Sequence, residues 1–158
     1  MFLDPQGFTR RGLKGRRVEH AVDEGEVREV VRLADYVKPN EVEARLMTGL
    51  RPEEAARELV RWGAKVGIVT LADRGSLVAC GDGAVYRVPA YRTRAVDPTG
   101  AGDVYAGAFI YKLLEGSSVL EAALFASAVA SIKVEHVGPD FPVTRGEGER
   151  RYRALVGR

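Results

Sequence analysis

The run DPTGAGD, from Asp97 to Asp103, leads directly into an apolar stretch and is the segment best suited to chemistry. Glycine and alanine carry little side-chain bulk, so backbone N–H groups can approach a ligand closely. The helix expected next begins with amides that lack partners inside the helix, and its positive end attracts anions. Asp103 adds a carboxylate that could remove a proton from a phosphate acceptor. The pattern predicts phosphoryl transfer, although acids are also common in first helical turns without any function.

A second polar pair, Asn40 and Glu43, opens a segment expected to be helical up to Met47. Asn at a helix start with Glu three residues later forms a capping box, which requires no function. Glu43 could also help to hold magnesium, because this ion keeps several waters and uses one or two carboxylates. The two interpretations are compatible, since a capped helix start can also be a ligand site.

The elements that must position these residues alternate between helix and strand, which predicts an α/β protein with a largely parallel sheet and antiparallel hairpins. The helix after the glycine run is apolar on nearly all faces and is expected to be buried in the middle of the domain. Helices are expected at about 23–34, 40–47, 52–62, 102–114 and 118–136, and strands at about 2–3, 36–38, 66–71, 76–80 and 84–91.

Length and composition narrow the function classes. A chain of 158 residues is expected to form a single domain over residues 1–158, and its net charge of +2 argues against a nucleic-acid binder. The basic segment 10–17 is interpreted as a solvated loop, or otherwise as a rim that attracts an anionic ligand. A lone Cys80, the absence of a secretory signal and the absence of a long apolar run predict a cytoplasmic protein without membrane contact. His20 and His136 show no metal-site pattern.

Three segments resemble the ribokinase-like (PfkB) carbohydrate kinases in the order of that family. DPTGAGD with the following Gly107-Ala108-Phe109 is similar to the second family signature, and residues 38–49 (KPNEVEARLMTG) resemble its Asn-x-x-Glu segment. Residues 69–76 (VTLADRGS) look like its nucleotide-side hairpin. The resemblance implies a ribokinase-like three-layer sandwich and an ATP-dependent, Mg²⁺-requiring kinase for a hydroxyl of a sugar or nucleoside. It covers only the C-terminal part of the family's length, so the N-terminal half and the lid are expected to be missing.

The resemblance also implies roles for individual residues. Asp103 would be the catalytic base, amides around Gly100, Ala101 and Gly102 would hold the transferred phosphoryl group, and Glu43 would serve the metal. The residues expected along the nucleotide are Asn40, Thr70, Gly75, Thr99 and Ser127.

Several of these residues have simpler interpretations. Gly75 fits an ordinary turn, and a serine between alanines, such as Ser127, is often a close-packing residue. Asp97 is interpreted as a turn residue that positions the glycine run, in preference to a ligand of the monovalent-cation site that many relatives have there. Residues 135–142 (EHVGPDFP) depart from the small-residue pattern of that cation site, which argues against potassium activation.

Two other functions stay open alongside the kinase. One is a catalytically inactive nucleotide- or phosphate-binding module or truncated remnant, and the other is a vitamin kinase of the pyridoxal type. The expected partners are ATP and a sugar or nucleoside acceptor. A sheet edge exposed at the strand of residues 2–3 would favour self-association into a homo-oligomer.

Overall fold

A computed structural model describes residues 1–6 and 24–157 of the chain. The basic segment 10–17 and His20 lie outside these residues. The chain forms two compact units. Unit 1 contains Met1–Leu71 and Leu77–Tyr86, and unit 2 contains Ala72–Ser76 and Arg87–Arg158. The prediction of one domain over the whole chain stays a prediction.

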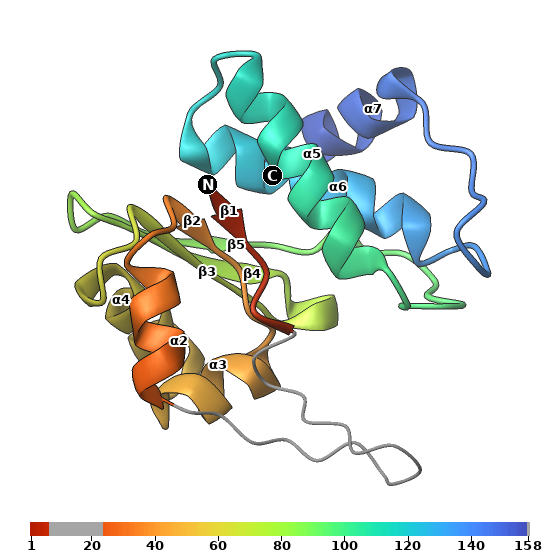
Figure 1. Ribbon diagram of the computed structural model, residues 1–158. Helices are drawn as coiled ribbons and strands as arrows, with labels where there is room; N and C mark the ends of the chain where they lie inside the picture. Colours follow the sequence, from red (N-terminus) through yellow and green to blue (C-terminus); the bar gives the residue numbers. More distant parts are fainter. Residues whose placement is uncertain (7–23, 158) are drawn as a thin grey trace, which may run out of the picture. The chain divides into compact units, whose positions relative to one another are not determined.

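The described residues form a five-stranded sheet in the order β1-β2-β3-β4-β5 (Figure 1). The first three strands are parallel, with Phe2 opposite Tyr36 and Tyr36 opposite Val66. The connections into β4 and β5 are too short for a parallel crossover, so these strands extend the sheet as antiparallel hairpins. The strands are β1 Phe2–Leu3, β2 Tyr36–Val37, β3 Val66–Thr70, β4 Ser76–Cys80 and β5 Val85–Val88. The predicted α/β class with a mixed sheet is therefore confirmed.

Three helices of unit 1 lie on the same side of its strands (Figure 1). They bury apolar residues together with β2. They are α2 Glu24–Val31, α3 Glu41–Thr48 and α4 Pro52–Arg61. Val31, Met47 and Leu59 each project from a different helix into one apolar cluster that includes Val37 of β2. Helix α4 lies so close to β3 that a Cβ at Gly67 would come within 2.3 Å of a backbone oxygen of α4. Unit 1 is thus held by helices packed tightly on the parallel part of the sheet.

Unit 2 contains α5 Ala101–Leu114, α6 Val119–Lys133 and α7 Arg145–Val156. Helix α6 begins with the expected capping box between Ser118 and Glu121, and ten of its residues are buried. Its alanines and serines therefore serve close packing, as the sequence predicted. No described helix, α6 included, is long and apolar enough to cross a membrane.

The expected burial of the helix after the glycine run is wrong. Tyr105, Ala108 and Phe109 of α5 are buried, but Ile110 is partly exposed and Leu114 is 84% exposed. The apolar character of a helix does not determine how many of its faces are buried, because this depends on the elements that pack against it. In unit 2, α6 is the helix buried on most sides, and α5 packs along one side only.

Helix α7 was not anticipated from the sequence. Its Gly148 lies against α6, where an added Cβ would come within 3.1 Å of Val129 and 3.3 Å of Phe125. Arg151 is buried and makes a two-pronged contact with Glu135, at 2.8 and 2.9 Å. These contacts depend on the tertiary structure, which explains why local sequence patterns did not reveal the helix.

Candidate functional site

The start of α3 is closed by its own side chains. Asn40 Oδ1 accepts a hydrogen bond from the Glu43 amide at 2.9 Å, and Glu43 Oε2 accepts one from the Asn40 amide at 2.9 Å. Gly49 ends the helix with a φ of +70°, in the left-handed region that suits glycine. The capping-box interpretation of Asn40 and Glu43 is therefore confirmed.

The same capping box leaves one carboxylate oxygen without a partner. Glu43 is only 3% exposed, and its Oε1 has no hydrogen-bond partner among the described residues. Burying a charged oxygen without a partner is costly, which favours a cation beside it. The described residues hold no group of three or more His, Cys, Asp or Glu side chains that could bind a metal. The unpartnered Oε1 of Glu43 is the kind of ligand that magnesium takes, since this ion usually keeps several waters and uses one or two carboxylates.

The ends of the parallel strands bring further polar residues beside Glu43's helix. Thr70, at the end of β3, pairs with Asn40 in a parallel β-bridge. Lys38, just after β2, is 3% exposed and its Nζ lies 2.7 Å from Asp4 Oδ2. Asp4 in turn follows β1. The carboxyl ends of parallel strands are the usual ligand-binding edge of open α/β sheets.

Sequence reasoning missed the pair of Asp4 and Lys38. Each residue directly follows a short apolar strand, and this was the available signal. The pair itself depends on β1 and β2 being neighbours, which the separate segments do not reveal.

The start of α5 has no side-chain cap, whereas the start of α3 has one. Gly100 occupies the N-cap with a φ of +80°, and no side chain caps the helix. The Ala101 amide donates to Pro98 O at 3.1 Å and so holds the turn. The amides of Gly102 and Asp103 have no acceptor inside the helix because they belong to its first turn. Asp103 projects its carboxylate from this turn into an exposed position.

Asp97 shapes the loop that precedes α5. Its Oδ1 accepts from the Thr99 amide at 2.9 Å, and its Oδ2 accepts from the Gly138 amide at 3.1 Å. These two bonds, with Thr99 the stronger cause, hold the pKa of the Asp97 carboxyl well below its usual range. The predicted turn role of Asp97 is confirmed.

Gly75 and Ser127 both lie close to the backbone of Val88 and Pro89. Gly75 has a φ of +88°, and a Cβ there would come within 2.0 Å of Val88 O. The Ser127 hydroxyl donates to Pro89 O at 2.7 Å. This bond supports the packing interpretation of Ser127, and the cofactor role of both residues stays a prediction.

The site residues predicted from the sequence divide between the two units. Unit 1 brings Asn40, Glu43 and Thr70 together at the strand ends. In unit 2, Thr99 directly precedes the N-cap and first turn of α5, residues 100–103. Gly75 and Ser127 both lie against Pro89 or its neighbour Val88.

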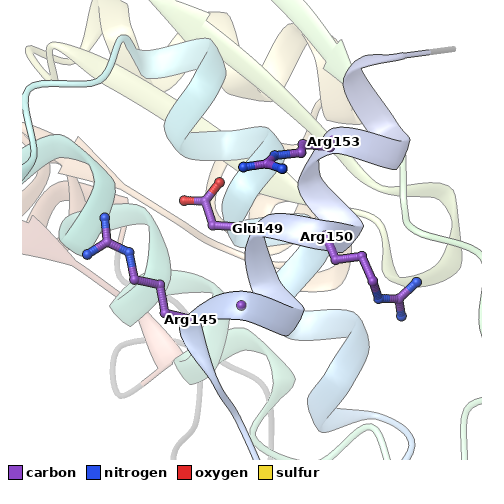
Figure 2. A pocket seen from close by; sticks show the side chains of 5 residues that line it. Arg145, Glu149, Arg150 and Arg153 are labelled. Atoms are coloured by element: carbon purple, nitrogen blue, oxygen red, sulfur yellow. The ribbon is translucent and has the colours of Figure 1, made fainter.

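A surface hollow on α7 is not part of this site (Figure 2). It is lined by Arg145, Gly146, Glu149, Arg150 and Arg153, and none of these was predicted as a site residue. Glu149 accepts from Lys112 at 2.7 Å, and Arg150 pairs with a glutamate of its own helix at 2.6 Å. These charges already have partners within unit 2.

Comparisons with known proteins agree on one family. Residues 18–145 match the model of the pfkB family of carbohydrate kinases. A cytidine kinase of Thermococcus kodakarensis is 38% identical over 112 residues, which cover 62% of this chain and 40% of that protein.

Two solved structures extend the comparison to the fold. The ribokinase of Thermotoga maritima matches with a TM-score of 0.75 and 31% identity, over 96% of this chain and 48% of that one. A putative ribokinase II of E. coli in complex with ATP and Mg²⁺ matches with a TM-score of 0.74 and 28% identity, over 82% of this chain and 42% of that one. The chain therefore spans less than half of the length of each of these relatives.

Proposed function

Because the chain belongs to the pfkB family of carbohydrate kinases, we propose that it carries the phosphate-handling part of a kinase that transfers a phosphoryl group from ATP to a hydroxyl of a sugar or nucleoside. The observation that carries the proposal is the open start of α5, where uncapped amides lie beside the Asp103 carboxylate. The relatives supply the two acceptor classes, because they include a ribokinase and a cytidine kinase.

In this proposal Asp103 is the catalytic base. Its carboxylate accepts the proton of the acceptor hydroxyl as the hydroxyl oxygen attacks the phosphorus. The amides that follow Gly100 and the positive end of α5 stabilise the charge on the transferred group. The Ala101 amide, which donates to Pro98, holds the loop in shape.

Glu43 is the residue proposed to serve magnesium. Magnesium, when bound with a nucleotide, neutralises charge on the phosphate oxygens during transfer. Glu43 would contribute its unpartnered Oε1, while its Oε2 stays committed to the Asn40 amide. The bound ATP and Mg²⁺ of the E. coli relative support this pair of cofactors. Thr70 and Asn40 lie at the same strand ends and are proposed to line the nucleotide.

A nucleotide-binding module without activity is the second candidate, because the chain spans 40% of the cytidine kinase and 48% of the ribokinase that it resembles. A vitamin kinase of the pyridoxal type remains a third. The cytoplasmic location, the self-association and the lack of a nucleic-acid partner are kept as predictions.

Two measurements on the purified chain separate these functions. Calorimetry with ATP and with ADP, in the presence of Mg²⁺, is expected to show binding. A coupled assay over a panel of sugars, nucleosides and pyridoxal is expected to show turnover with a sugar or a nucleoside. Binding without turnover would favour the module, and turnover with pyridoxal alone would favour the vitamin kinase. A chain that binds neither nucleotide would overturn the proposal.

A further inference from the structure

Lys133, the last residue of α6, is a buried cation that the proposed chemistry does not use. Only 3% of its side chain is exposed. Its ammonium donates to the backbone carbonyl of His136 at 3.0 Å and to that of Asp97 at 3.2 Å. A third oxygen, Asp97 Oδ2, lies 3.6 Å from Nζ. The ammonium is therefore surrounded by oxygens from the loop before α5 and from the segment after α6.

The oxygen atoms around the Lys133 ammonium resemble the ligands of a bound monovalent cation more than the carboxylate partner of an ordinary salt bridge. Its two hydrogen bonds go to neutral carbonyls. Among the residues that the structure describes, the one carboxylate paired with it is that of Asp97, which already accepts from the amides of Thr99 and Gly138. The ring of Phe141 covers the site with its centroid 5.9 Å from Nζ. Backbone carbonyls together with one carboxylate form the kind of oxygen cage that desolvates hard monovalent cations.

The cage joins the loop before α5 to the segment after α6. Lys133 binds Asp97 on one side and His136 on the other, and the Asp97 carboxylate makes the same connection through Gly138. Lys133 also contacts the glycine loop, since its Cε would lie 3.8 Å from a Cβ at Gly100. Losing the ammonium would leave the carbonyls of the cage without a donor and loosen the loop that presents the start of α5.

We propose that Lys133 is a positioning residue whose ammonium acts as a tethered monovalent cation for the loop Asp97–Gly100, so that the chain needs no potassium or other free monovalent ion to hold this loop in shape. The cage itself is independent of the proposed kinase function. The consequence for phosphate binding rests on that function. Removing the side chain would open a cage that a free cation of similar size can enter.

The test compares Lys133→Ala, which empties the cage, with Lys133→Met, which fills it with an uncharged chain. Thermal unfolding is measured in ammonium, potassium and tetramethylammonium chloride at equal ionic strength. Both variants are expected to lose at least about 5 °C in Tm, because a buried charge partner is removed. Ammonium and potassium should restore most of the loss in Lys133→Ala and little of it in Lys133→Met, while tetramethylammonium is too large to restore either. Equal responses of the two variants would overturn the proposal.

The unaltered chain provides a test that does not require a variant to fold. When potassium is replaced by tetramethylammonium, the ATP affinity of the unaltered chain is expected to change less than twofold. Its Tm is expected to change very little. A specific rise in Tm with potassium would overturn the tethered-cation proposal. If no ATP binding is seen in any salt, the proposed kinase function fails, and the melting experiments still decide the role of Lys133.

Discussion

The starts of α3 and α5 differ in how their first-turn amides are satisfied. At α3 the side chains of Asn40 and Glu43 satisfy the helix start themselves and leave one buried carboxylate oxygen over. At α5 a left-handed Gly100 replaces the side-chain cap, so the amides of the next turn are available to a ligand. One start therefore offers a negative oxygen and suits a cation, and the other offers N–H groups and suits an anion. Two ends of the same kind of element have been given opposite chemical preferences by a few residues.

The largest expected effect tests whether the start of α5 does chemistry as well as binding. Asp103→Asn keeps the shape of the side chain and removes the base, so turnover on any accepted sugar or nucleoside is expected to fall by roughly 10²–10⁴. ATP affinity should stay within a few fold, because Asp103 is not proposed to hold the nucleotide. Steady-state assays with parallel calorimetry measure both quantities. A variant that keeps the unaltered rate would remove Asp103 from the mechanism.

The next effect tests whether the left-handed glycine is what keeps the start of α5 open. Gly100→Ala is expected to destabilise the fold by about 1–2 kcal/mol, because a side chain is disfavoured at a φ of +80°. It should also weaken ATP binding. Gly107→Ala is the matched control in the same helix, where a Cβ meets nothing within 4 Å and should stabilise by about 0.5–1 kcal/mol. Urea denaturation reads out both variants, and equal effects would mean that the backbone at Gly100 is unimportant.

The smallest expected effect concerns the unpartnered Oε1 of Glu43 at the start of α3. Glu43→Gln preserves a capping box, since glutamine serves at this position as glutamate does, so the free energy of unfolding should change little. The magnesium concentration needed for half-maximal ATP binding is expected to rise about tenfold.

Glu121→Gln is the control for that change. Glu121 holds the same capping position in α6, where its side chain is exposed, and its replacement should leave the magnesium dependence unchanged. If both variants show the same magnesium dependence, Glu43 is only a cap and the comparison between the two helix starts loses its functional meaning.

Local signals explain which parts of the molecule could be predicted from the sequence. The capping pairs at Asn40 and Ser118, and the glycine after Thr48, mark helix ends because they act within a single turn. The hairpin strands were equally visible, since glycines separate their apolar runs. The turn made by Asp97 was predicted as well, because its acceptor and donor are two residues apart.

Features that depend on distant residues were not predictable. Helix α7 is held by the burial of Arg151 and by the close approach of Gly148 to α6. The buried ammonium groups of Lys38 and Lys133 have oxygen partners more than thirty residues away in the sequence at Asp4 and Asp97. A lysine looks the same in a sequence whether it is solvated or caged. The extent to which α5 is buried also depends on its neighbours, and the expectation there was wrong.

The crowding around Gly75 has a consequence for how related sequences should be compared. With Val88 O only 2.0 Å from the position of a Cβ, any other residue would force the hairpin apart, whatever ligand the protein handles. Natural variants are therefore expected to retain glycine here even after enzymatic activity has been lost. An invariant glycine at this position in an alignment would be evidence of shared architecture, and it would say nothing about whether a nucleotide is bound.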